Sequence, residues 1–210
     1  MPASGVEANE RLTASTAVLL LVLLAVEGVT VLSVRSLLRP HVFVGMVLIP
    51  PILVKIGSTL YRFARYYAGA PGYREKGPPV WILRMLGPAV VLLTVTMFAS
   101  GVALLFASGS GRRLLLTVHK ASFILWFVVT AVHVLGHLAE TSRLGLPDWV
   151  GTWWRRYVPR WAAPASPSGR SGHLRRALLL VSLGVGAVLG VVLLGRVGTY
   201  LGTVPVHLRQ

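Results

Sequence analysis

Three histidines lie within one apolar stretch of the chain, TVHKASFILWFVVTAVHVLGHLAE, which covers residues 117–140. In an α-helix, the 14 residues from His119 to His133 correspond to roughly 21 Å along the axis and an angular offset of about 40°. His137 follows His119 by 18 residues, or about five whole turns, so the pattern predicts all three side chains on one helix face. Imidazoles inside a membrane helix usually face a bundle interior or a functional pathway. These histidines are therefore candidates for binding a cofactor or transferring protons.

A second apolar stretch carries a histidine and a lysine at the same spacing. His41 lies near its beginning, and Lys55 stands 14 residues further along the chain. If both stretches cross the membrane in the same direction, His41 lies at the depth of His119, and Lys55 lies near the depth of His133 or His137. Bis-imidazole ligation of haem requires two helices that each present one neutral imidazole to the interior of a bundle. The sequence predicts that His41 and His119 meet this requirement.

The composition indicates the environment of these helices. Hydrophobic residues make up 54% of the 210 residues and charged residues only 13%, which is too apolar for a water-soluble domain of this size. A transmembrane helix needs roughly 20 mostly apolar residues. Five segments meet this requirement: 16–34, 41–61, 85–108, 114–138 and 177–194. The predicted fold is an all-α integral membrane protein, with a four-helix transmembrane bundle and a fifth, C-terminal transmembrane helix.

The first apolar segment differs from a signal peptide. Its leader contains Glu7 and Glu10 beside the single basic residue Arg11, and no small-residue cleavage site follows the apolar run. We therefore expect an uncleaved transmembrane helix at this position.

The formal net charge of +15 is explained by the placement of the basic residues. With the N-terminus in the cytoplasm, thirteen of the 21 basic residues fall in cytoplasmic segments, six fall in outer segments and two lie within helices. This is the positive-inside pattern, so we expect a protein of the bacterial cytoplasmic membrane in contact with lipid, and no nucleic-acid partner. The chain has no cysteine, which excludes iron–sulfur clusters, c-type haem attachment, zinc–thiolate sites and disulfides within it.

Short outer connections limit the arrangement of the predicted helices. The connections RSLLRP and SGSGRR are so short that the first helix must neighbour the second, and the third must neighbour the fourth, as antiparallel hairpins. Beyond the fourth helix, aromatic residues recur at every fourth position beside arginines: Trp149, Trp153, Tyr157 and Trp161. This pattern predicts a short helix in the membrane interface, which anchors the chain or forms a platform for a partner. Residues 162–172 then form a flexible linker.

The chain accordingly divides into three parts. They are a four-helix transmembrane core (12–140), a cytoplasmic interfacial segment with its linker (141–174), and a C-terminal transmembrane helix with its tail (175–210). We expect the last helix to be an addition to the four-helix core. Three glycines in it would allow close packing against another helix: Gly184, Gly186 and Gly190.

The histidine arrangement resembles that of the small membrane-bound b-type cytochromes of the cytochrome b superfamily. In that family, histidines at this spacing on parallel helices bind haems stacked towards the two membrane faces, and the resemblance covers residues 12–140. It implies His41 and His119 as the axial iron ligands of one haem b. It also implies that Gly45, one turn from His41, leaves room for the porphyrin; simple helix packing is the alternative.

The sequence departs from this family at the inner level. Lys55 stands where the partner of His133 or His137 is expected, and a lysine ammonium cannot coordinate iron. We therefore predict one haem b, with a second only doubtful. Lys55 would instead contact a haem propionate, a quinone oxygen or a lipid headgroup. Glu27 is the only acidic residue within a predicted span. It is a candidate hydrogen-bond partner for the non-ligating nitrogen of His41, and the alternatives are a proton-relay group or a protonated helix contact.

Basic residues also gather at the outer end of the predicted bundle: Arg39, Arg112, Arg113 and Lys120. Propionates of a haem bound near this end would need cations. Exposed loop charges are an equally simple explanation.

The predicted function is electron transfer by a b-type cytochrome, between a membrane donor such as quinol and a partner oxidoreductase subunit. The sequence contains no hydrolytic triad, phosphate-binding loop or dinucleotide fingerprint. We therefore expect an electron-transfer subunit rather than a complete enzyme. Two alternatives remain open. One is a scaffold subunit of a larger complex without a cofactor, and the other is a transporter that moves protons or ions along its buried ionisable residues.

Overall fold

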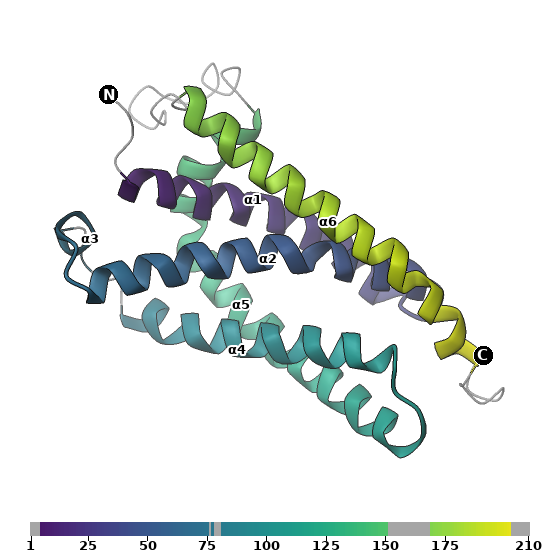
Figure 1. The fold of residues 1–210 in the computed structure, drawn as a ribbon. Helices are drawn as coiled ribbons and strands as arrows, with labels where there is room; N and C mark the ends of the chain where they lie inside the picture. The colour runs from purple at the N-terminus through teal and green to yellow at the C-terminus, as the bar shows by residue number, and fades with distance from the viewer. Residues whose placement is uncertain (1–4, 76, 78–80, 151–168, 203–210) are drawn as a thin grey trace.

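The computed structural model describes residues 5–75, 77, 81–150 and 169–202 (Figure 1). The described residues form helices only: α1 (Gly5–Leu32), α2 (Leu38–Tyr67), α3 (Pro71–Glu75), α4 (Trp81–Leu104), α5 (Gly109–Val150) and α6 (Gly169–Gly202). All except the short α3 are long and apolar enough to cross a membrane, which gives five such helices among the described residues. The predicted all-α membrane fold with five spanning helices is confirmed.

Several helices extend beyond the apolar segments that predicted them. The longest, α5, has 42 residues, or about 63 Å at 1.5 Å per residue, which is roughly twice the hydrocarbon thickness of a bilayer. It includes residues 146–150, the beginning of the segment predicted to lie in the membrane interface, and Trp149 donates a hydrogen bond from Nε1 to the carbonyl oxygen of Ser15 (2.9 Å). Residues 151–161 of that segment lie outside the described residues. Trp149 thus belongs to the contact between α5 and α1.

The helix pairs agree with the hairpins predicted from the short connections. Helix α1 packs against α2, and α4 packs against α5, while the contact between α1 and α5 joins the two hairpins. We call the end of the bundle that contains the connections 33–37 and 105–108 the hairpin end. The short α3 lies at the opposite end, where the hydroxyl group of its buried Tyr73 donates to the carbonyl oxygen of Gly5 (3.4 Å). Burial raises the pKa of Tyr73.

Helix α6, which we expected to be an addition to the four-helix core, packs along α2 (Figure 1). A Cβ atom added to Gly186 would lie 2.7 Å from Cα and from O of Val47, and one added to Gly190 would lie 2.6 Å from Cδ2 of Phe43. Nothing lies within 4 Å of a Cβ added to Gly184. Close glycine packing is therefore found at Gly186 and Gly190 and is absent at Gly184.

We predict that Gly186→Ala destabilises the protein and that Gly184→Ala does not. The added methyl group at position 186 meets the α2 backbone, which cannot rotate away as a side chain can, and overpacking of this kind costs about 1–3 kcal/mol. The same substitution at position 184 has open space and gains helix propensity. Thermal unfolding of both variants in one detergent, followed by tryptophan fluorescence, measures the difference. Equal melting temperatures for the two variants would contradict the close α2–α6 contact.

Helices α2 and α4 make few contacts with each other, and these are concentrated near the hairpin end. There, a buried cluster joins α2 to α6 and to the residue that follows α4: Met46, Leu105 and Val197. Further along, the two helices border a groove of about 520 Å³ with apolar walls, which include Ile52, Ile56 and Phe98. Phe98 and Val102 of α4 line this groove, whereas Met97 and Gly101, each one position earlier in the chain, contact His119.

Candidate functional site

Two histidines from different hairpins face each other near the hairpin end. The rings of His41 on α2 and His119 on α5 have centroids 6.4 Å apart and planes inclined by 74°. Lys55 and the other histidines of α5 lie further from this end. The structure thus brings together the two side chains that the sequence paired by depth.

His41 is oriented by residues of α1. Its Nδ1 atom lies 2.8 Å from Oε1 of Glu27 and 3.3 Å from Oγ1 of Thr30. Thr30 in turn donates to the Glu27 carboxylate at Oε2 (3.0 Å) and lies 2.7 Å from the Glu27 main-chain oxygen. Because a carboxylate only accepts hydrogen bonds, this arrangement favours the hydrogen on Nδ1 of His41. The contact expected between Glu27 and His41 is present.

His119 is oriented by residues of α4. Its Nδ1 atom lies 2.9 Å from the carbonyl oxygen of Met97 and 3.3 Å from Oγ of Ser100. A main-chain carbonyl also only accepts, so Nδ1 of His119 is the donor in this contact. The ring lies against Gly101, since a Cβ atom added there would be 3.0 Å from Cε1 of His119. Any larger residue at position 101 would displace the imidazole.

Both imidazoles therefore present Nε2 as the nitrogen with a free lone pair. Among the described residues, neither His41 nor His119 makes a hydrogen bond through Nε2. Two imidazoles that bind one metal ion from opposite sides, with metal–nitrogen bonds of about 2 Å, have ring centroids roughly 6 Å apart. The observed separation of 6.4 Å matches this spacing. The pair has the donor atoms and the separation of two axial ligands.

Among the described residues, no third candidate metal ligand forms a group with His41 and His119. Within the described ranges, no group of three or more His, Cys, Asp or Glu side chains is arranged to hold a metal ion. Protein zinc sites use three or four such side chains, whereas haem iron takes four nitrogens from the porphyrin and needs only axial ligands from the protein. The residues present fit haem better than a metal ion held by protein side chains alone.

Gly45, expected to leave room for a porphyrin, lies beside the Glu27 carboxylate. A Cβ atom added at position 45 would be 3.8 Å from Oε1 of Glu27 and close to nothing else. The open space at this position is compatible with the expected role, which stays a prediction.

A second group of ionisable side chains lies deeper in the bundle. The Lys55 ammonium group donates to the carbonyl oxygen of Thr13 on α1 (2.9 Å). The rings of His133 and His137 are 4.8 Å apart, and Nδ1 of His137 is 3.7 Å from Oε2 of Glu140. Nδ1 of His133 is buried without a hydrogen-bond partner among the described residues. The Lys55 amino group is thus held by α1, and its expected position opposite His133 or His137 stays a prediction.

Aromatic side chains separate the two levels. Trp126 is buried and donates from Nε1 to Oγ1 of Thr94 (2.8 Å), and it stacks on Phe123 with centroids 6.4 Å apart. These contacts fix α5 against α4 between the two groups of ionisable residues.

Sequence reasoning missed a buried ion pair at the opposite end. Arg175 of α6 donates from Nε to Oδ2 of Asp148 (2.8 Å) and from Nη2 to Oδ1 (2.9 Å), and Ser15 of α1 donates to the same carboxylate (2.6 Å). Gly145 allows α5 to approach α1 closely near this ion pair, since a Cβ atom added there would lie 2.5 Å from the carbonyl oxygen of Ala14. The sequence offered one signal for this pair. Asp148 is one of only six acidic residues in a chain with 21 basic residues, so it has many possible basic partners.

Sequence reasoning also missed the α4 residues that orient His119. The signal for them was weak, because a main-chain carbonyl such as that of Met97 has no signature in the sequence. No protein-family model, curated protein or solved structure matches this chain, so the geometry of the site carries its interpretation.

Proposed function

We propose that this protein is a membrane-bound b-type cytochrome that binds haem b through His41 and His119. In this proposal it passes electrons between a membrane donor, such as quinol, and a partner oxidoreductase subunit. The observation that carries the proposal is the His41–His119 pair, in which each Nδ1 is held by an acceptor and each Nε2 is left to bind iron.

The residues around the pair have defined roles in this proposal. Haem, when bound, supplies one-electron chemistry at its iron, and the protein tunes that iron through the axial ligands and their hydrogen bonds. The Glu27 carboxylate holds His41 and increases its basicity, as an acidic partner does for a metal-bound imidazole. The Met97 carbonyl holds His119 through a neutral and weaker contact. The two ligands are thus chemically unequal.

We propose one haem per chain. The Lys55 amino group is engaged by the Thr13 carbonyl, which supports a role as a polar contact and not as an iron ligand. His133 and His137 lie on the same helix one turn apart, so they approach a cofactor from the same side. A second bis-histidine site would need an imidazole from a facing helix.

The proposed location is the cytoplasmic membrane of a bacterium, with the N-terminus in the cytoplasm. The excess of basic residues in the segments at the opposite end from the hairpin connections supports this orientation. The haem would then lie towards the outer face, because His41 is one turn from the start of α2 at the hairpin end.

The experiment is a spectrum of the purified protein. After expression with added haem precursor and purification in mild detergent, we expect a reduced-minus-oxidised spectrum with the Soret and alpha bands of low-spin haem b. A pyridine haemochrome assay is expected to give one haem per chain. Protein that carries no haem under these conditions would overturn the proposed function, and a value of two would show that the deeper residues also bind haem.

A further inference from the structure

Exposed basic side chains lie at the hairpin end, the same end of the bundle as the histidine pair. Arg39, Arg113 and Lys120 are all exposed, and we call these three residues the basic rim. Arg39 precedes His41 by two residues, and Lys120 directly follows His119. The basic rim therefore lies at the end of the bundle that contains the histidine pair.

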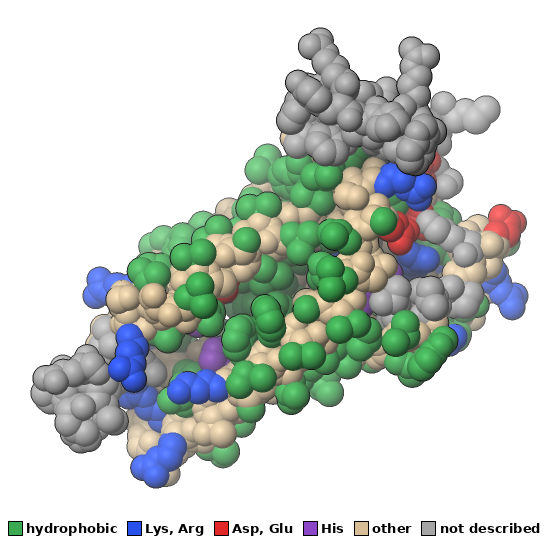
Figure 2. Space-filling view, turned by 180° about the vertical axis from the view of Figure 1, so that it is seen from behind, with side chains coloured by type: hydrophobic (Ala, Val, Ile, Leu, Met, Phe, Trp, Pro, Cys, Tyr) green, Lys and Arg blue, Asp and Glu red, His purple; other side chains and the backbone are tan. Residues whose placement is uncertain are grey.

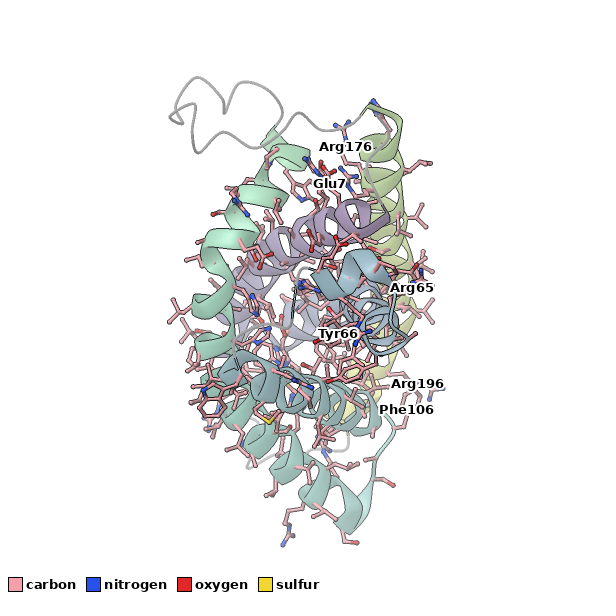
Figure 3. The ribbon with its side chains drawn as sticks, turned by 90° about the vertical axis from the view of Figure 1, so that its left-hand side faces the viewer. Glu7, Arg65, Tyr66, Phe106, Arg176 and Arg196 are labelled. Carbon is pink, nitrogen blue, oxygen red and sulfur yellow. The ribbon has the colours of Figure 1, made fainter. Side chains whose placement is uncertain are left out.

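The charge of this end is unbalanced. Of the six acidic residues in the chain, only Glu27 is found in the half of the bundle near the hairpin end, and it is engaged with His41 and Thr30. Figure 2 shows Lys and Arg side chains around a histidine at one end of the molecule, whereas most acidic side chains visible on this face lie at the other end. Arg196 of α6 adds a further exposed cation beside Phe106, with Cζ 5.2 Å from the ring centroid (Figure 3). Within the described part of the chain, the hairpin end thus presents several exposed cations, and Glu27 is its one acidic side chain.

The composition of this end argues against a lipid surface as its main ligand. Trp and Tyr are enriched in the parts of membrane proteins that lie at the level of the headgroups. The opposite end has this pattern, with exposed Tyr61, Tyr67 and Trp81 beside Arg84. Residues 27–49 and 100–125, which form the hairpin end of α1, α2, α4 and α5, contain no Trp or Tyr. The basic rim therefore lacks the aromatic residues of a headgroup-binding belt.

We propose that the basic rim is the docking surface for an acidic electron-transfer protein. This inference rests on the proposed function, because docking here would bring the redox group of the partner close to the haem held by His41 and His119. A positive surface attracts an acidic partner and raises the association rate by a factor of about 10 to 10³ at low ionic strength. Salt weakens such an attraction between exposed charges.

A binding experiment tests the surface without requiring haem. The variant Arg39→Gln/Arg113→Gln/Lys120→Gln is compared with the matched control Arg65→Gln/Arg74→Gln/Arg84→Gln, which removes three exposed charges at the opposite end. Each protein is placed in nanodiscs of zwitterionic lipid, and binding of a poly-L-glutamate probe is measured by surface plasmon resonance. We expect the rim variant to lose about ten-fold or more in affinity at low salt, and the control variant to lose less, because acidic residues such as Glu10 and Glu75 accompany the basic residues at the opposite end. Equal losses in the two variants would overturn the proposal.

A kinetic experiment connects the surface to electron transfer. Reduced protein is mixed in a stopped-flow instrument with ferricyanide, an anion, or with tris(phenanthroline)cobalt(III), a cation; each accepts one electron from the ferrous haem. The rim variant should react about ten-fold more slowly with ferricyanide and faster with the cobalt complex, and high salt should remove both differences. Unchanged rates with both oxidants would overturn the proposal.

The two experiments separate the possible failures. Protein without haem cannot react in the kinetic experiment, and this outcome would contradict the proposed function. The same protein can still be tested for binding of poly-L-glutamate, which measures the docking surface independently of haem. The lipid explanation is tested by repeating the binding in nanodiscs that contain phosphatidylglycerol. If the anionic lipid displaces the probe from the wild type, and the rim variant no longer retains that lipid on purification, the rim binds lipid and the proposal is wrong.

Discussion

Replacing either His41 or His119 by Ala is expected to abolish binding of low-spin haem b. The rings of His41 and His119 lie 6.4 Å apart, and the other described histidines lie in other parts of the molecule, His133 and His137 together on α5 and His173 beside Arg176 on α6. Loss of one ligand leaves the iron with a single protein ligand, and the hydrogen bonds of the other imidazole cannot replace the missing bond. We expect the alpha and Soret bands of the reduced-minus-oxidised spectrum to fall to background in both variants.

The control for this prediction is His173→Ala. His173 is an exposed residue near the start of α6, where its Nδ1 is 3.2 Å from Nη2 of Arg176. This variant should keep the wild-type spectrum and haem content. His119→Ala or His41→Ala protein that kept both bands would show that the ligand assignment is wrong, even if the protein is a cytochrome.

The second large effect is expected at the buried ion pair of Asp148 and Arg175. In Asp148→Ala, the Arg175 guanidinium group remains buried without its carboxylate, and an uncompensated charge of this kind destabilises a protein by about 3–5 kcal/mol. Ser15 also loses the acceptor of its hydroxyl group. Because the pair joins α5 to α6, we expect a strongly lowered melting temperature and faster proteolytic cleavage between these helices.

The double variant Asp148→Leu/Arg175→Met provides the matched comparison. It removes both charges and keeps similar side-chain volumes, and replacing a buried pair by apolar residues is often neutral or stabilising. Its melting temperature should therefore be much closer to that of the wild type than that of Asp148→Ala. If the single and double variants are equally destabilised, the ion pair is not the source of the effect.

The sequence predicted those features that depend on local patterns. Apolar runs of membrane-spanning length identified the five long helices, and two short connections identified their hairpins, because neither inference needs information about distant residues. The pairing of His41 with His119 followed from equal depth on two helices that run in the same direction. The contact between Glu27 and His41 was also accessible, since a membrane helix with one acid and one nearby imidazole offers few other partners.

Features that depend on tertiary geometry were not predicted. The Met97 carbonyl that holds His119 becomes available only where α4 approaches α5, and every residue of α4 has the same main-chain group. The ion pair joins Asp148, which lies in the segment predicted to be interfacial, to Arg175, which lies beyond the predicted flexible linker. The position of α6 along α2 depends on close contacts of Gly186 with Val47, and glycine patterns of this kind are too common to specify a partner helix.

The hydrogen bonds of the two histidines also divide the site in a way that bears on its assembly. His41 and Glu27 belong to the hairpin of α1 and α2, whereas His119 and Met97 belong to the hairpin of α4 and α5. Each hairpin thus contains the hydrogen-bond partner of its own imidazole. In the proposed cytochrome, each hairpin would supply one half of the haem site, and insertion of the hairpins into the membrane could precede the binding of haem between them.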